Sequence, residues 1–288
     1  MVRKPIVAGQ FYDSDPAILE KQIADSFLHE KGPGKLPDKK RNNRIIGVIS
    51  PHAGYFFSGP GAAWSYKAVA ESGFPEVYIL LGLSHSGFES CISLEDWKTP
   101  FGIIKVDKEF GERLIKNSNL QEDEIAHNHE HSIEVQLPFL QFVNKEYLTA
   151  LKIAPIIVSP DIKYTEIAQS IKKTIDELKR KVCIIVSSDF THYGMNYGYM
   201  PFTSDAKKNM YSLDKKAIEF TKNLDAYHFL EYTEETGATI CGKYPIAVAL
   251  ELCKLLNTSK VKLLQYYTSG DIVNDYSNAV GYASIVFE

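Results

Sequence analysis

Three apolar, β-branched runs of this chain each end close to a histidine, and these histidines are the residues best placed to do chemistry. The runs lead to His52, to His85 and, through Asp189, to His192. Unbroken Val- and Ile-rich runs are typical of strands buried on both faces of a sheet covered by helices. Polar residues at the carboxyl ends of such strands converge on one edge, where open α/β sheets bind ligands. The pattern therefore predicts a metal or acid/base centre at that edge.

The first two histidines follow their strands in a similar way. His52 precedes Ala53 and Gly54, and a glycine there lets the backbone turn sharply and approach whatever the imidazole holds. His85 occupies the equivalent place after the run that ends at Ser84. We expect the two rings to be presented from neighbouring strand ends. For either histidine alone, the alternative is a structural residue bonded to loop carbonyls.

Asp189 and His192 are three residues apart, a spacing that places both on one side of a single turn. A carboxylate beside an imidazole fixes its tautomer and raises its basicity, which suits a general base or a support for a metal ligand. The alternative is that Asp189 caps the following turn and His192 packs beside it. Both interpretations stay open at the level of sequence.

A second histidine cluster occupies residues 127–134. His127 and His129 lie in a polar stretch that predicts a solvated loop. His131 and Glu134 begin an apolar run with helical periodicity, and their i, i+3 spacing would place them on one helix face. We expect this second pair, rather than the first, to reach the interior.

Cys241 lies between a turn and the start of a predicted helix. A thiol near a helix amino end is biased toward thiolate, the form that binds metals or attacks carbonyls. The alternative is a small buried hydrophobe, which is the interpretation that suits Cys183 and Cys253. The four cysteines form no CxxC pair, so neither a disulfide framework nor a Cys-rich zinc knuckle is indicated.

The elements that must position these residues follow from periodicity and from start and stop signals. A helix is predicted from residue 15 to 29, and residues 31–43 are predicted to be an exposed connector. Further strands are predicted at 45–50, 77–84, 151–158, 182–187, 261–268 and 279–287. Further helices are predicted at 62–70, 107–117, 132–144, 163–180, 204–223 and 243–256. We expect one α/β domain spanning residues 1–288.

The net charge and the distribution of apolar residues exclude some classes of function. The formal net charge of -4 argues against a protein that neutralises phosphate backbones, so no nucleic acid partner is expected. No stretch approaches the roughly 20 consecutive apolar residues of a membrane helix, and the amino terminus does not read as a signal peptide. A soluble, cytoplasmic protein without a membrane partner is the expectation.

Six motifs taken together resemble the Memo family, named for the mediator of ErbB2-driven cell motility. They are Ala8-Gly9-Gln10-Phe11-Tyr12, Pro51-His52-Ala53-Gly54-Tyr55, Gly82-Leu83-Ser84-His85, Glu130-His131-Ser132-Ile133-Glu134, Ser187-Ser188-Asp189-Phe190-Thr191-His192 and Ile240-Cys241-Gly242-Lys243-Tyr244-Pro245. Memo proteins are similar to the class III extradiol dioxygenases, which are non-heme iron enzymes. The resemblance implies a three-layer α/β/α fold around a central mixed, largely parallel sheet.

The resemblance also implies roles for individual residues. His52 and His85 would be the imidazole ligands of a metal, and Cys241 would replace the carboxylate that completes the dioxygenase site. Iron, as Fe2+, is the metal that this implies, with copper or zinc as alternatives because a thiolate is softer than a carboxylate. His192 would be the acid/base of an open active-site pocket, with Asp189 beside it. His131 and Glu134 would support the ligands from behind.

Three functions are consistent with this assignment. The first is a metal-dependent, dioxygenase-like oxidoreductase acting on an unknown small molecule. The second is a non-catalytic adaptor that binds a peptide or phosphopeptide in the same pocket. The third is a zinc-dependent hydrolase, because the same ligands around an open position could activate water.

Overall fold

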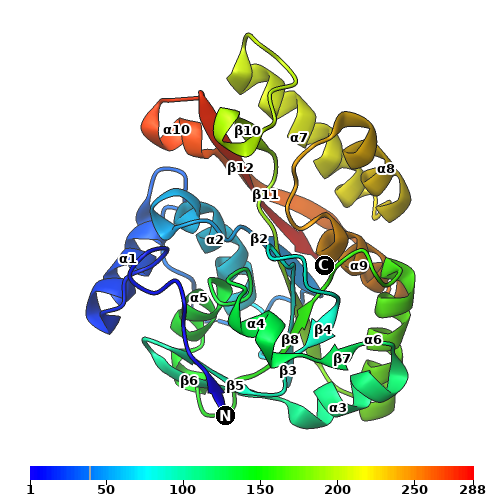
Figure 1. The fold of residues 1–288 in the computed structure, drawn as a ribbon. Helices are drawn as coiled ribbons and strands as arrows, with labels where there is room; N and C mark the ends of the chain where they lie inside the picture. The colour runs from blue at the N-terminus through cyan, green and yellow to red at the C-terminus, as the bar shows by residue number, and fades with distance from the viewer. Residues whose placement is uncertain (39) are drawn as a thin grey trace.

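A central sheet and two layers of helices make up the structure (Figure 1), a computed structural model that describes residues 1–38 and 40–288. The strands in the described chain are β1 (Val2–Arg3), β2 (Gly47–Ser50), β3 (Val77–Gly82), β4 (Cys91–Ile92), β5 (Asp96–Thr99), β6 (Gly102–Val106), β7 (Gln121–Glu122), β8 (Lys152–Ile157), β9 (Val182–Ser187), β10 (His192–Gly194), β11 (Val261–Thr268) and β12 (Asn278–Phe287).

The helices in the same residues are α1 (Pro16–Leu28), α2 (Tyr55–Ala70), α3 (Lys108–Asn117), α4 (Glu124–Asn128), α5 (Gln136–Val143), α6 (Tyr164–Leu178), α7 (Ala206–Lys222), α8 (Ala226–Thr236), α9 (Lys243–Leu255) and α10 (Ser269–Val273), with short 3-10 turns at Lys145–Tyr147 and Met195–Tyr197. None of the helices in the described residues combines the length and the apolar character that crossing a membrane requires.

The sheet is mixed, with a parallel centre. Its order along the main path is β1-β5-β6-β8-β3-β9-β2-β12-β10, with β11 paired to β12, β4 to β8 and β7 to β4. The five consecutive strands β6, β8, β3, β9 and β2 are parallel to one another, whereas β5 joins β6 and β12 joins β2 antiparallel. The predicted three-layer α/β/α class is therefore confirmed. One detail of the prediction is wrong: β9 lies between β2 and β3, so His52 and His85 do not follow neighbouring strands.

The core lies on both faces of the sheet because the central strands are apolar at nearly all of their inner positions. Along β3, Ile79 and Leu81 belong to the cluster that packs under α3, α6, α7, α8 and α9. The alternate residues Tyr78 and Leu80 belong to the cluster under α1, α2 and α5. Figure 1 shows the same division of the helices between the two faces. This two-sided burial holds the carboxyl ends of β2, β3 and β9 rigidly side by side.

Helix α2 begins earlier than predicted. The small residues from Ala62 onward predict a start after Gly59-Pro60-Gly61, whereas the helix begins at Tyr55 and carries Pro60 inside it. The N–H of Gly61 donates to the Tyr267 hydroxyl at 3.0 Å, so a tertiary contact satisfies a backbone group within this irregular stretch. The early start is important because it places the first turn of α2 directly after His52.

Candidate metal centre

The structure brings three residues from remote parts of the chain together at the carboxyl edge of the sheet. His52 lies two residues beyond β2, His85 lies three residues beyond β3, and Cys241 lies two residues ahead of α9. One ring nitrogen of each histidine and the sulfur of Cys241 all lie within 4.8 Å of one another. The sulfur is 3.4 Å from Nε2 of His52. Parallel strands end at the same edge, and this is why residues so distant in sequence converge.

The tautomer of His52 follows from its neighbours. Its ring is buried, and Nδ1 lies 2.9 Å from the hydroxyl oxygen of Ser187. That hydroxyl donates its own hydrogen to the carbonyl of Ser132 at 2.6 Å, and it also accepts from the amide of Gln136. It can therefore only accept from His52, which places the ring hydrogen on Nδ1. The lone pair of Nε2 is left facing Cys241, and burial lowers the pKa of His52, which keeps the ring neutral.

His85 is held by a buried carboxylate. Nδ1 of His85 lies 2.9 Å from Oε1 of Glu130, and the His85 backbone N–H donates to Oε2 at 2.6 Å. Burial opposes ionisation of Glu130, but the hydrogen bonds from His85 and the Ser132 N–H prevail and hold its pKa at about 2. For His85, burial lowers the pKa and the Glu130 hydrogen bond raises it, with a net upward shift. A carboxylate on Nδ1 orients the imidazole so that Nε2 faces the centre, as is usual for metal-binding histidines.

The electrostatics of Cys241 differ from the sequence-based expectation. Its sulfur accepts the Asp189 N–H at 3.3 Å and lies close to the start of α9. Burial nevertheless raises the pKa of the thiol well above its usual value, and the Asp189 carboxylate raises it further. The predicted bias toward thiolate is wrong, because desolvation outweighs the backbone dipoles near a helix start. A cation that takes the place of the thiol proton would reverse this balance.

Asp189 and His192 take separate hydrogen-bond partners. Oδ1 of Asp189 accepts the backbone N–H of His52 at 2.8 Å, so the carboxylate ties β9 to the segment after β2 and does not cap its own turn. Burial raises the pKa of Asp189. Nδ1 of His192 lies 3.1 Å from the carbonyl of Thr239, which can only accept, so Nδ1 carries the hydrogen and Nε2 is left with a lone pair. The ring edge of His192 contacts Tyr197.

His131 and Glu134 separate, contrary to the expectation that they share a helix face. Helix α5 begins only at Gln136, so the preceding residues form turns and the i, i+3 rule does not apply to this pair. The ring of His131 stacks on His85 with centroids 4.5 Å apart. Glu134 forms a buried ion pair with Arg3 at 2.6 Å and accepts the Tyr12 hydroxyl at 2.8 Å. Glu134 therefore anchors the amino-terminal segment.

Two other expectations for this segment have different outcomes. His129 is exposed, in agreement with the predicted solvated loop. His127, however, is fully buried in α4 against the edge of Trp97, and neither of its ring nitrogens has a hydrogen-bond partner. A loop was predicted because the neighbouring residues are polar; the tertiary fold buries the ring nonetheless.

Sequence reasoning missed the residues that orient the two histidines. Glu130 and Ser187 were both inside recognised motifs, but nothing in their spacing linked Glu130 to His85 or Ser187 to His52. Ligand atoms of His85, Glu130 and His131 also lie within 4.8 Å of one another. Both oxygens of Glu130 are already engaged, however, with Oε1 accepting the N–H groups of His131 and Ser132 at 2.8 and 2.7 Å. We therefore assign Glu130 to orienting His85 and not to holding a second ion.

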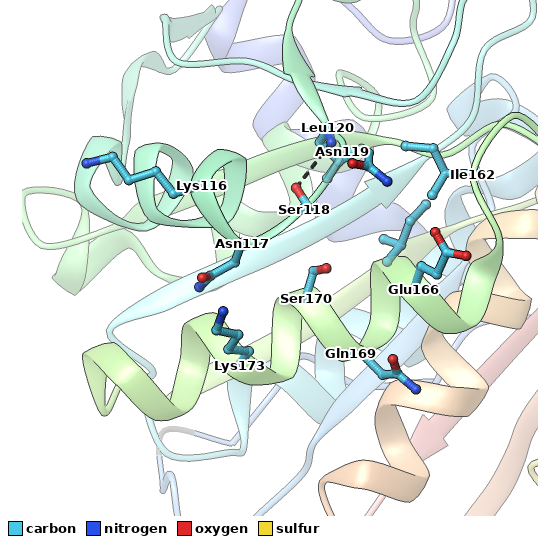
Figure 2. Close-up of a pocket in the computed structure, with 11 residues that line it drawn as sticks. Lys116, Asn117, Ser118, Asn119, Leu120, Ile162, Glu166, Gln169, Ser170 and Lys173 are labelled. Atoms are coloured by element: carbon cyan, nitrogen blue, oxygen red, sulfur yellow. Dashed lines mark hydrogen bonds between the residues drawn. The ribbon is translucent and has the colours of Figure 1, made fainter.

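A surface pocket between two helices does not include the imidazole and thiol cluster. A pocket of about 430 Å³ lies between α3 and α6, where Asn117, Glu166, Ser170 and Lys173 are among the residues lining it (Figure 2). None of its described lining residues is a histidine or a cysteine. The chemistry therefore resides in the imidazole and thiol cluster.

The donor set of that cluster fits a transition metal. Two imidazole nitrogens with defined lone pairs and one thiol sulfur converge on a common point. Imidazole suits iron, copper and zinc, whereas a thiolate excludes the hard cations that prefer oxygen. Fold and cluster together define an α/β protein with a candidate metal centre at the carboxyl edge of its sheet.

Comparison with known proteins identifies the family. The chain belongs to the Memo-like family, whose model, described as Memo-like protein, matches residues 3–286. A MEMO1 family protein of Methanopyrus kandleri is 42% identical over 294 residues, covering 100% of this chain and 99% of the relative. MEMO1 family proteins of Methanobrevibacter smithii and Sulfurisphaera tokodaii are 39% and 40% identical, over 100% of this chain and 100% and 99% of their own lengths. The predicted family is thus confirmed.

Proposed function

We propose that this chain is a metal-binding, oxidoreductase-like protein that holds iron or copper through His52, His85 and Cys241. The observation that carries the proposal is the convergence of three ligand atoms, from three remote segments, to within 4.8 Å of one another. A redox-active metal bound by two imidazoles and one thiolate would supply one-electron chemistry and positions open to further ligands. The substrate of such a centre is an unidentified small molecule.

The two histidine rings are preorganised for metal binding in the metal-free protein. Ser187 and Glu130 hold the hydrogens of His52 and His85 on Nδ1, so both Nε2 lone pairs face the centre without rearrangement. The thiol of Cys241 is protonated in the metal-free protein, because burial raises its pKa, and it must lose that proton on binding. Metal affinity is therefore expected to rise with pH.

His192 is proposed as the residue that moves protons. The Thr239 carbonyl and hydroxyl hold its ring and its backbone N–H, leaving Nε2 able to accept or return a proton. Asp189 is buried beside the centre and fixes the backbone of His52 through a 2.8 Å hydrogen bond. Its carboxylate would stabilise positive charge that develops on the surrounding imidazoles.

The test is elemental analysis and absorption spectroscopy of anaerobically isolated protein. We expect about one iron or copper per chain in the wild type and at least a tenfold loss of metal affinity in His85→Ala and Cys241→Ser. His129→Ala, which removes an exposed histidine outside the proposed ligand set, is the matched control and should retain the metal. Cys241→Ser should in addition abolish any sulfur-to-metal charge-transfer band.

Two results would contradict this proposal. Full metal content in both His85→Ala and Cys241→Ser would remove these residues from the coordination sphere. Zinc as the only metal after anaerobic isolation would favour the hydrolase instead. Glu130→Gln provides an internal check, because it keeps all three ligands and removes the charge and one acceptor oxygen behind His85. It should weaken metal affinity by about 10- to 100-fold without changing the spectrum of the fully loaded site.

A further inference from the structure

A second pocket lies at the opposite edge of the sheet from the metal centre. It has a volume of about 620 Å³, and the residues lining it come from the segments that precede β2, β3 and β9 and from the ends of α6 and α9. These three strands are parallel, so the edge where they begin is the edge away from His52 and His85. The pocket is therefore separate from the metal centre.

The floor of this pocket is apolar. Six of its thirteen lining residues are hydrophobic, and Ile45, Ile46, Val182 and Leu256 are among them. Ile45 is buried and packs in the core, so this part of the floor is set by the fold. A concave apolar surface with a few polar groups at its rim is the usual form of a small-molecule site.

The polar rim carries one sign of charge. Arg44, Arg180 and Lys181 line the pocket, and none of its thirteen lining residues is acidic. Arg44 and Lys181 are exposed, so both side chains are able to turn toward a ligand. Two exposed cations over an apolar floor match a molecule with one anionic group and an apolar body.

The guanidinium of Arg180 is already paired with carboxylates. Its terminal nitrogens reach Glu76, Glu109 and Asp107, which lie outside the pocket lining. Its Nε, in contrast, is buried and has no hydrogen-bond partner. An N–H with no accessible surface does not face the pocket, so the cations able to meet a ligand at the rim are the exposed Arg44 and Lys181.

We propose that this pocket binds a small organic carboxylate with an aliphatic chain of medium length. The carboxylate would lie between the exposed Arg44 and Lys181, while the chain would lie on Ile46, Val182 and their apolar neighbours. The proposal does not depend on the metal centre, because no residue is shared between the two.

The test is isothermal titration calorimetry on the full-length protein with octanoate as the probe. Acetate, which has the charge without the chain, and octanol, which has the chain without the charge, should each bind at least about tenfold more weakly. The double variant Arg44→Ala/Lys181→Ala should raise the dissociation constant for octanoate by about tenfold or more. The exposed pair Lys4→Ala/Lys98→Ala is the matched control for the loss of two positive charges and should leave it unchanged.

A third variant tests the floor. Ile46→Trp fills the pocket and should abolish octanoate binding, with thermal unfolding used to confirm that the protein is folded. Equal binding of octanol and octanoate, unchanged affinity in the arginine and lysine variant, or no octanoate binding by the wild type would each overturn the proposal. Metal content, measured on the same samples, should be unaffected throughout, which separates this result from the fate of the metal-centre proposal.

Discussion

Asp214 offers a sharp test of how burial controls charge in this fold. The residue lies on α7 and is fully buried. Its Oδ1 accepts the Thr191 hydroxyl at 2.5 Å, and its Oδ2 accepts the Tyr266 hydroxyl at 2.5 Å. Both partners are neutral. Burial therefore dominates over the hydrogen bonds and raises the pKa of Asp214 from 3.8 to about 6.

The sign of the effect on stability follows from proton counting. Between about pH 4 and pH 6, folded Asp214 retains a proton that the unfolded chain has released, so the free energy of unfolding falls as pH rises. The stability that the retained proton contributes is fully present below 3.8, the pKa of Asp214 in the unfolded chain. It is lost as pH rises through about 6, the pKa of Asp214 in the folded protein. A shift of roughly two pH units, at about 1.4 kcal/mol per unit, corresponds to about 3 kcal/mol.

Asp214→Asn removes the titration while keeping the shape of the side chain. We expect the difference in unfolding free energy, variant minus wild type, to be about 3 kcal/mol more positive at pH 7 than at pH 4. Urea unfolding followed by circular dichroism, with a chelator present, measures it. Asp176→Asn, an exposed carboxylate on α6, controls for the change in net charge. A difference that stays constant with pH, or that favours the wild type at pH 7, would refute the reasoning.

Three further predictions concern buried polar groups and close packing. Arg3→Ala leaves the buried Glu134 carboxylate without its cation. Denaturant titrations should therefore show a free energy of unfolding lowered by about 3–5 kcal/mol, and a loss below about 1 kcal/mol would contradict this. Gly281→Ala places a Cβ 2.2 Å from Oδ2 of Asp214. Calorimetry should therefore show a lower melting temperature, and the free energy of unfolding should fall by about 1–3 kcal/mol. An unchanged melting temperature would be inconsistent with this close packing. Burial lowers the pKa of His127 from 6.5 to about 3, so its contribution to stability is lost as pH falls below 6.5. Between pH 6.5 and pH 4.5, the free energy of unfolding of His127→Leu should therefore rise by about 3 kcal/mol relative to that of the wild type. Parallel pH profiles of the two proteins would argue against this.

The sequence by itself predicted the fold class, and its resemblance to the Memo family singled out the three ligand candidates. The strands β2, β3 and β9 are unbroken apolar runs, and such runs are stable only between two layers of helices, so their sequences predict a buried sheet. His52, His85 and Cys241 each lie beside a recognisable strand end or helix start. Their approach to a common edge then follows from the parallel direction of the strands.

Only the tertiary structure decided strand order and the partners of each polar group. Hydrophobic periodicity reports which face of an element is buried and carries no information about its neighbour, so the position of β9 between β2 and β3 was not predictable. For the same reason Glu134 was grouped with His131, although the fold sends its carboxylate to Arg3, 131 positions earlier in the chain.

The protonation state of the Cys241 thiol shows most directly why some properties depend on the tertiary structure. A helix start beside Cys241 is a local feature that the sequence reveals, and it predicts a lowered pKa. Desolvation is a property of everything that surrounds the sulfur, from β9 to the segment after β2, and it raises the pKa instead. Local chemistry can be predicted from the order of residues, whereas burial and charge depend on neighbours that only the folded chain brings together.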